Sequence, residues 1–357
     1  MVLYTINRTT PFYERKKAMK TFRRLFPVLM VLFVFFAGCA SSGNSEIRKA
    51  IDEELGQLKK LDSGFQDASS LFFKDFDYKI LSVDVDKEKK NADASVRITT
   101  LDAGDLARDY KSALLETEIQ KAAASSSGGT VSSSEKDRLL YDLLSKNSYN
   151  TIRNTTDISL SQKDGQWTLN RTESLRDILS GGLYSGLEDP DLLSPSETLD
   201  IYLRSIKNMD TSQLTNYLGV DSITATDSES KKAIAQALLL QMQQHFDYEI
   251  TDTSWKGRTA VVTAGITTFD SDAILDAYQT DMDAYLSSPD AVIDGAEKRT
   301  AIAQEKLLGY ITDNTSTLTS EADFEMENDG TGWRLIHPGE DLGNALFGSL
   351  ISVPEGS

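Results

Sequence analysis

Between positions 194 and 350 the apolar residues follow two different spacings, and each spacing predicts a different kind of element. Ser194 and Pro195 suit the start of a helix, and Glu197 completes a capping box with Ser194. The apolar residues that follow recur every three or four positions and predict a helix. They are Leu199, Tyr202, Leu203, Ile206 and Met209.

A second helix is predicted from about Thr226, because Glu229 stands three residues later and helical spacing continues beyond it. Residues 246–250 and 259–269 are rich in aromatic and β-branched residues and predict two strands. The turn between them is expected near Gly257.

Three further patterns complete this part of the chain. Residues 273–286 and 296–311 predict two helices, because their apolar positions again follow helical spacing. Residues 322–327 alternate between apolar and polar, and 333–336 follow a turn signal, so a second pair of strands is expected. Residues 342–350 suit a terminal helix.

The first half of the chain repeats short segments of the second half at offsets of 170, 168 and 166 residues, and Tyr110 recurs as Tyr278. A nearly constant offset of this length predicts two duplicated domains. The matching segments are 76–80 with 246–250, 98–102 with 266–270, 165–169 with 331–335, and 175–183 with 342–350.

The first copy differs from the second at two places. Ser and Gly residues at 125–129 predict a flexible loop before a helix that restarts at about Ser132. The stretch before Phe76 is short, so most of the second helix should be missing. We expect a signal peptide at 1–38, a tether at 39–45, a first repeat at 46–187, a linker at 188–194, a second repeat at 195–351 and a tail at 352–357.

The residues before Cys39 resemble the end of a secretory signal. Lys20, Arg23 and Arg24 precede an apolar run over 25–36, and Ala37-Gly38-Cys39 follows it. This order resembles the bacterial lipobox, in which the chain is cut before the cysteine. The resemblance implies cleavage after Gly38 and lipidation of Cys39.

An uncleaved membrane helix is the alternative for this segment, but residues 25–40 include Pro27 and are fewer than the roughly 20 apolar residues that a spanning helix needs. Met19 offers a second start, because signal peptides are usually shorter than 38 residues. The sequence therefore predicts a protein held at the cell membrane by lipid and facing away from the cytoplasm.

Charge excludes one class of partner. Residues 1–38 contain seven basic residues and one acid, which leaves 30 basic and 54 acidic residues, a formal charge of −24, in the chain from Cys39 on. A protein that binds nucleic acid needs a basic surface, so we do not expect this acidic chain to have nucleic acid as a partner. The same acidity disfavours contact between the body of the protein and anionic lipid headgroups.

No motif specifies a reaction, a metal or a cofactor. His245 and His337 are 92 residues apart, and Cys39 is the one cysteine, so no zinc site is expected. Asp84 and Asp86 begin like a calcium loop, but Lys89 stands where that loop requires Gly. Nucleophile elbows and phosphate-binding loops are also missing from the sequence.

The order of helices, hairpin, helical crossover and hairpin predicts an α+β fold with a curved antiparallel sheet against helices in each repeat. It resembles the cone-shaped fold of nuclear transport factor two and ketosteroid isomerase. It is more similar to lipoprotein domains of Gram-positive bacteria that share this fold, in which a Trp-containing last strand precedes a small-residue helix, as at 332–335 and 344–348.

The resemblance implies display at the cell envelope and supplies no catalytic residues. We therefore expect a non-enzymatic binding or scaffolding role toward an envelope protein or a small ligand. The alternative is a small-molecule-binding protein or isomerase-like enzyme that uses the cone cavity of one repeat. In that case Tyr110 and Tyr278 are the candidate ligand-binding residues, although the simpler interpretation is that both pack on a sheet.

Overall fold

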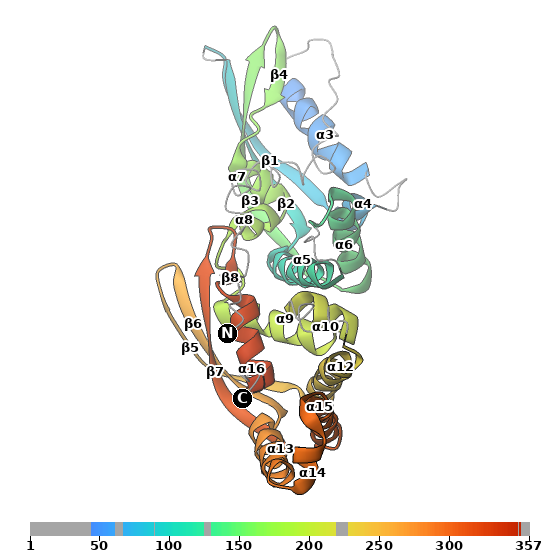
Figure 1. Cartoon of the computed structure of the whole chain (residues 1–357). Helices are drawn as coiled ribbons and strands as arrows, with labels where there is room; N and C mark the ends of the chain where they lie inside the picture. Colours follow the sequence, from blue (N-terminus) through green and yellow to red (C-terminus); the bar gives the residue numbers. More distant parts are fainter. Residues whose placement is uncertain are drawn as a thin grey trace. The chain divides into compact units, whose positions relative to one another are not determined.

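The computed structural model describes residues 44–60, 67–88, 90–124, 130–218, 228–348 and 350. These residues form two compact units. The N-terminal unit contains the described residues up to Leu114 and from Val131 to Leu192. The C-terminal unit contains those of Leu115–Thr130 and those from Leu193 on. Figure 1 labels their helices and strands.

The N-terminal unit combines a four-stranded antiparallel sheet with helices that precede, interrupt and follow it. The strands lie in the order β1-β2-β3-β4. The elements are α3 (Asn44–Lys60), α4 (Ala68–Phe72), β1 (Asp77–Asp86), β2 (Asn91–Leu101), the first part of α5 (Gly104–Ala124), α6 (Ser133–Lys146), β3 (Thr151–Lys163), β4 (Gln166–Leu169), α7 (Glu173–Leu179) and α8 (Leu183–Glu188).

One face of this sheet is apolar and buried. Along β2 the side chains of Ala92, Ala94, Val96 and Ile98 are buried, while most of those between them are exposed, as the period of two in a strand requires. Helical side chains cover the buried face, and each fully buried one contributes about 1.5–3 kcal/mol. Ile51, Leu55, Phe72, Leu106 and Leu183 are each at most 2 % exposed.

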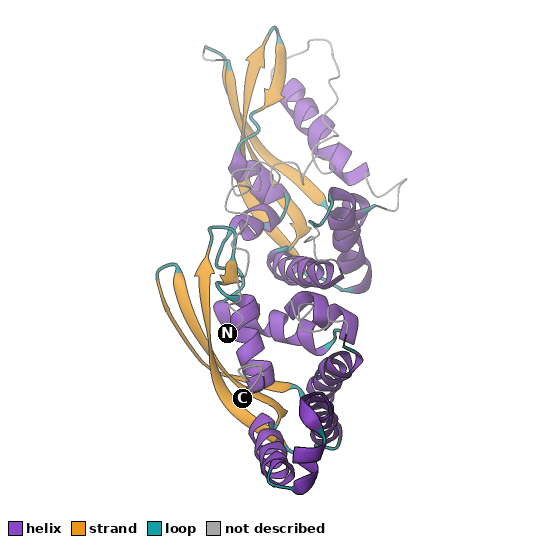
Figure 2. Ribbon diagram, viewed as in Figure 1, coloured by secondary structure: helices purple, strands orange, loops and turns teal. Residues whose placement is uncertain are grey.

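The C-terminal unit contains a second four-stranded antiparallel sheet, in the order β5-β6-β7-β8. Its strands and helices are shown in orange and purple in Figure 2. The elements are the last part of α5, then α9 (Pro195–Lys207), α10 (Thr211–Leu218), α12 (Glu229–His245), β5 (Asp247–Lys256), β6 (Thr259–Phe269), α13 (Ser271–Leu286), α14 (Pro289–Ile293), α15 (Gly295–Thr312), β7 (Thr317–Asn328), β8 (Trp333–Leu335) and α16 (Pro338–Phe347).

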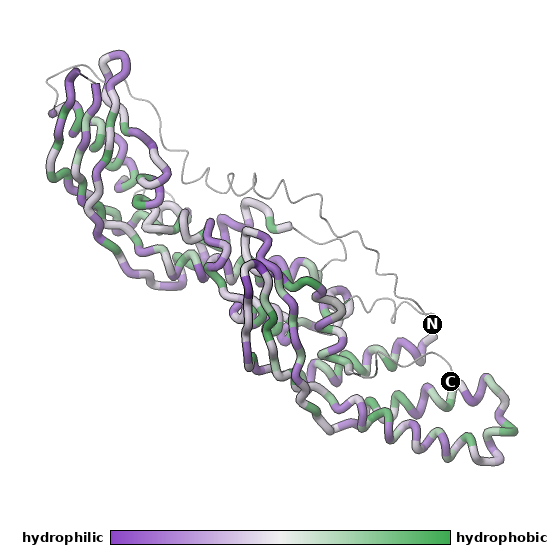
Figure 3. Tube along the Cα trace, turned by 90° about the vertical axis from the view of Figure 1, so that its left-hand side faces the viewer, coloured by the Kyte–Doolittle hydropathy of each residue, from purple (hydrophilic) through white to green (hydrophobic). Residues whose placement is uncertain are grey.

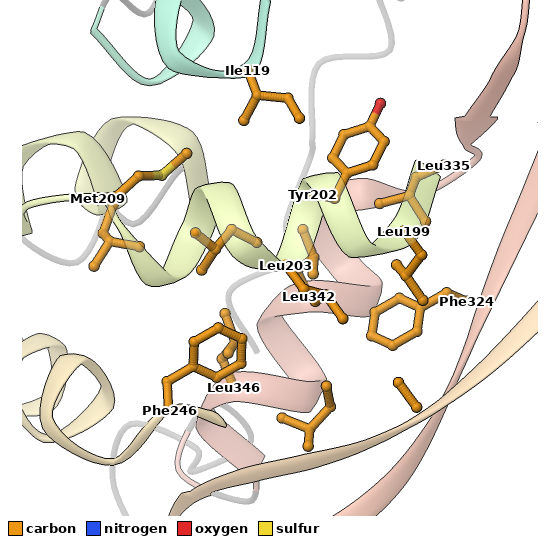
Figure 4. Packing of buried hydrophobic residues seen from close by; sticks show 14 of the residues in the cluster. Ile119, Leu199, Tyr202, Leu203, Met209, Phe246, Phe324, Leu335, Leu342 and Leu346 are labelled. Atoms are coloured by element: carbon orange, nitrogen blue, oxygen red, sulfur yellow. The ribbon is translucent and has the colours of Figure 1, made fainter. Parts of the chain in front are cut away.

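The core of the C-terminal unit lies between this sheet, α9 and α16, as Figure 4 shows. Leu203 of α9, Leu342 and Leu346 of α16 and Phe324 of β7 are each 0 % exposed. Apolar and polar residues alternate along the strands, which Figure 3 shows as alternating green and purple. The face opposite the core is therefore polar and carries exposed side chains.

The two units share details of strand register. The β1–β2 pairing shifts between Ile80 and Ser82, and the β5–β6 pairing shifts between Ile250 and Asp252. Each shift is a bulge, which leaves Leu81 or Thr251 without a cross-strand partner. These two positions differ by the same offset of 170 residues that relates the sequences of the two strands.

Hydrogen bonds recur in the same way. The buried hydroxyl of Thr100 donates to the carbonyl of Leu179 at 3.1 Å, and that of Thr268 donates to the carbonyl of Leu346 at 3.1 Å. Both bonds tie the inner side of a central strand to the closing helical segment of the same unit. Each satisfies a hydroxyl that would be costly to bury without a partner.

The predicted elements are largely present. The α+β class is confirmed, as is the capping box of Ser194 and Glu197 at the start of α9. The capping box at Ser132 begins α6, and between α3 and β1 the described residues of the N-terminal unit form only the five-residue helix α4. The curved cone and the domain boundaries stay predictions.

Several boundaries differ from the predictions. Helix α12 is capped by Ser228, so its predicted start was two residues early, and Thr226 lies outside the described residues. Strand β5 continues to Lys256 because the bulge at Thr251 lets pairing resume beyond it. Strand β7 begins at Thr317, since its first residues pair with β6 although they lack apolar alternation.

Gly181 and Gly165 provide a matched test of backbone packing. Both have positive φ, 59° and 81°, but a Cβ on Gly181 would lie 1.7 Å from the carbonyl oxygen of Leu101, whereas a Cβ on Gly165 would meet nothing within 4 Å. Gly165→Ala should lower the free energy of unfolding by about 1–2 kcal/mol. Gly181→Ala should lower it by about 3 kcal/mol or more, because the backbone must also move. Urea unfolding measures both, and equal losses would contradict this packing.

Candidate functional site

A polar contact between helix and strand recurs in the two units. In the N-terminal unit the hydroxyl of Tyr78 on β1 donates to Asp52 of α3 at 2.9 Å. In the C-terminal unit the hydroxyl of Tyr248 on β5 donates to Asp200 of α9 at 2.8 Å. We call this arrangement, together with the lysine pair described next, the helix–strand clamp.

The lysine pair lies seven residues further along each helix. Lys59 contacts Asp77 at 2.7 Å, and Lys207 contacts Asp247 at 2.8 Å. Seven residues are close to two helical turns, so the acid and the lysine of each helix lie on one side of it. The helix therefore holds two successive residues of its strand, an Asp and a Tyr.

The contacts of the clamp shift the pKa values of its tyrosine and aspartate side chains. Burial, and then the hydrogen bond to Asp52, raise the pKa of Tyr78 to about 12. Burial and the bond to Asp200 likewise raise the pKa of Tyr248. The hydrogen bonds from Lys59 and Lys207 lower the pKa of Asp77 and Asp247, but both carboxylates are exposed and these pairs contribute little to stability.

Tyr110 and Tyr278 occupy different environments despite their recurrence in sequence. Tyr110 lies on α5 and is 4 % exposed. Tyr278 lies on α13 and is half-buried, and burial raises its pKa. The recurrence therefore does not give two equivalent ligand positions, and a role for either residue stays a prediction.

Cys39 lies outside the described residues. His245 is the last residue of α12, and His337 is the N-cap residue of α16. In the part of the chain that the structure describes, no group of three His, Cys, Asp or Glu side chains is placed to hold a metal ion. None of the described helices is long and apolar enough to cross a membrane.

A polar cluster that the sequence did not reveal joins the last part of α5 to the rest of the C-terminal unit. Arg334 on β8 donates to Glu118 at 3.0 Å, and Asn216 on α10 donates to the carbonyl of Ala123 at 3.1 Å. Tyr202 lies beneath this segment, and its hydroxyl points away from the core in Figure 4. No pattern in the sequence indicates these contacts, because their partners lie up to 216 residues apart.

Helices α13, α14 and α15 expose apolar side chains at their junction. Asp281 accepts from Lys306 at 2.6 Å and from Tyr310 at 3.2 Å, and Asp294 accepts from Tyr285 at 2.9 Å. These bonds hold the three helices together. Ala291 of α14 is buried, whereas its neighbours are exposed, Val292 at 81 % and Ile293 at 80 %. We call these two residues the apolar tip.

No protein-family model and no curated protein matches the chain. Among solved structures, the chain is similar to that of a lipoprotein candidate (ycdA) from Bacillus subtilis, with 12% sequence identity and a TM-score of 0.26. The match covers 76% of this chain and 94% of that chain.

Substitution of Tyr78 tests the clamp. Burial, and then the bond to Asp52, raise the pKa of Tyr78 from about 10 to about 12 on folding, so the neutral side chain contributes its full stabilisation below pH 10. That stabilisation is lost as the pH rises from about 10 to about 12. Tyr78→Phe should lower the free energy of unfolding by about 1 kcal/mol at pH 7 and should weaken its pH dependence in that window.

Urea unfolding at several pH values measures both effects. Asp52→Asn is the control, because it keeps an acceptor oxygen but removes the charge, so part of the alkaline pH dependence should remain. The clamp would be refuted if Tyr78→Phe and the unchanged chain lost stability in parallel between pH 10 and 12.

Proposed function

We propose that this protein is a lipid-anchored surface lipoprotein that displays two copies of one α+β unit outside the cytoplasm, with a non-enzymatic binding or scaffolding role. The order of basic residues, apolar run and Ala37-Gly38 before Cys39 carries the anchoring part. Two acyl-bearing groups on one cysteine would hold the chain firmly, because each buried methylene contributes about 0.8 kcal/mol.

The recurring contacts support the duplication. The bulges, the threonine bonds and the strand residues of the helix–strand clamp occupy positions that the sequence repeat relates. If the two units had arisen independently, both would have had to acquire the same register shift at the same point of an edge strand, at Leu81 of β1 and at Thr251 of β5. Descent from one ancestral unit explains all of these features together.

The packing of apolar side chains inside both units supports a non-enzymatic binding role and does not favour an enzyme with an internal pocket. An isomerase of the cone type would need a desolvated acid facing a pocket. Among the described residues, the polar ones that are buried as a whole are Ser, Thr, Gln and Asn, and no Asp or Glu is among them. Phe, Leu and Ile side chains occupy the space between each sheet and its helices.

The apolar tip supports a role in binding another protein. Val292 and Ile293 are adjacent β-branched residues on a short helix that buries the smaller Ala291 instead. Exposed apolar residues held on a well-ordered support are typical of contact sites. Asp290 beside them is exposed as well, so a partner with an apolar recess and basic rim would fit.

Lipidation of Cys39 is tested by metabolic labelling in a Gram-positive host fed an alkyne-bearing fatty acid. The unchanged protein should carry the label in the tryptic peptide from Cys39 to Arg48 and should remain with the membrane fraction. Cys39→Ser should lose the label and the membrane association, since no other thiol is present.

The double variant Cys39→Ser, Ser42→Cys is the matched control, because it keeps one cysteine but moves it away from Ala37-Gly38. It should also remain unlabelled. Labelling of either variant, or an unmodified thiol at Cys39 in the membrane-bound protein, would refute the proposed anchor.

A further inference from the structure

Strand β5 lies at one edge of the C-terminal sheet and pairs with β6 along one side. Its last residues, 252–256, follow the bulge at Thr251 and are again in regular register with β6. We call residues 252–256 the edge segment. Thr253 is half-buried, and the other residues of the segment are exposed.

The free side of the edge segment exposes backbone groups that have no strand beside them. The N–H of Asn328 donates to the carbonyl of Arg258 at 2.8 Å, and from there every second residue of β6 bonds to β7. The residues between them bond to β5, where their partners are the even-numbered residues of the edge segment. The N–H and C=O groups of Thr253 and Trp255 therefore point away from β6, and within the described residues they have no hydrogen-bond partner.

Trp255 is the second unusual feature of this edge. Its side chain is on the inner face of the sheet, in one row with Ala260 of β6 and Met326 of β7. These two neighbours are 4 % and 0 % exposed, whereas Trp255 is 62 % exposed. An exposed aromatic side chain beside an open strand edge favours association with another strand, because both the ring and the backbone gain partners.

The edge segment is complementary to itself when a second copy runs antiparallel to it. With Ser254 of both copies on a two-fold axis, Asp252 of each copy is opposite Lys256 of the other. On the inner face Trp255 of each copy is opposite Thr253 of the other, and these two residues exchange backbone hydrogen bonds. Opposite charges and aromatic–β-branched pairs that face each other across two strands both stabilise a sheet.

This register is the one that pairs the charges. If the axis passed through Thr253, Asp252 would lie opposite Ser254, and if it passed through Trp255, Lys256 would lie opposite Ser254. Asp252 and Lys256 are both exposed, and in the part of the chain that the structure describes neither of them has an ion pair. Both charges are thus available to a second copy.

The N-terminal unit provides a comparison within the same chain. Residues 82–86 of β1 match the edge segment at the offset of 170 and follow a bulge in the same way. In the same antiparallel register, Asp84 would lie opposite Asp84 of a second copy, and Val85 stands where the C-terminal unit has Trp255. Like charges opposite each other destabilise a sheet. The complementarity is therefore a property of the C-terminal unit.

We propose that the edge segment binds the edge segment of a second copy of this chain, so that the two C-terminal sheets continue into each other around an axis at Ser254. Main-chain hydrogen bonds hold a strand that is added to an open sheet edge, and side chains select its register. Both copies use the same patch, so the contact closes at the dimer. One short strand buries less than the about 1,200 Å² of a stable complex, so the dimer forms reversibly.

A cysteine on the axis traps such a reversible dimer. Ser254 would face its counterpart at a non-hydrogen-bonded pair, where Cα atoms are about 4.5 Å apart and a disulfide fits. The test chain begins at position 39, which keeps every described residue, and carries Cys39→Ser with Ser254→Cys as its one thiol. The matched control carries Asp84→Cys instead. Non-reducing gels give the rate of disulfide-linked dimer formation, divided by the rate at which the same thiol reacts with a small thiol reagent.

The chain with Ser254→Cys should form linked dimers about tenfold faster than the chain with Asp84→Cys. Adding Asp252→Lys should slow the linking about tenfold, because two lysines then face each other in each pair. Asp252→Lys together with Lys256→Asp should restore the rate. Glu249→Lys makes the same change of charge on the same face of β5 outside the edge segment, and it should leave the rate unchanged.

Trp255→Val, which gives β5 the residue that β1 has at this position, should slow the linking about threefold. Equal rates for Ser254→Cys and Asp84→Cys would overturn the proposal, as would a rate that Asp252→Lys leaves unchanged. Linking between the two cysteine chains in an equal mixture, as fast as that of Ser254→Cys alone, would show pairing of two different edges and would also overturn it.

Discussion

Each unit is governed by the alternation of side chains in a strand, which gives a four-stranded sheet one apolar face and one polar face. The apolar face must be covered, and the helices before β1, between β2 and β3, and after β4 supply the cover in the N-terminal unit. In the C-terminal unit, helices α9, α12 and α16 cover the apolar face of the sheet. The polar faces remain outside and are free to differ.

This constraint explains what could be predicted from sequence. Strand β6 could be predicted because apolar residues alternate along Thr259–Phe269. Helix α9 could be predicted because the capping box of Ser194 and Glu197 precedes apolar residues at helical spacing. Strand β5 was predicted too short, since the bulge at Thr251 breaks the alternation on which the prediction depended. Helices α7, α8, α10 and α14 are five to eight residues long and show too few periodic positions to be recognised.

The clamp shows why the contacts were harder to predict than the elements. Asp77 and Tyr78 belong to a repeated segment, but their partners do not keep its offset. Lys59 and Asp77 are 18 residues apart, whereas Lys207 and Asp247 are 40 apart, because α10 and α12 occupy the longer interval. Tyr110 and Tyr278 kept the offset and yet differ in burial, so recurrence in sequence alone does not identify a site.

The two units resemble each other more on their inner faces than on their outer ones. The inner threonine bonds, the bulges and the tyrosine–aspartate bonds of the clamp occur in both units. The outer residues differ, since Lys79 of β1 corresponds to Glu249 of β5 and Arg97 of β2 corresponds to Gly265 of β6.

An experimental structure of the chain from Asn44 on would test the central claim, that one unit occurs twice, most directly. Superposition of β1, β2 and β3 on β5, β6 and β7 should align the bulges at Leu81 and Thr251 and bring Thr100 onto Thr268. Bulges at non-corresponding positions, or pairings that differ in register between the two sheets, would contradict it.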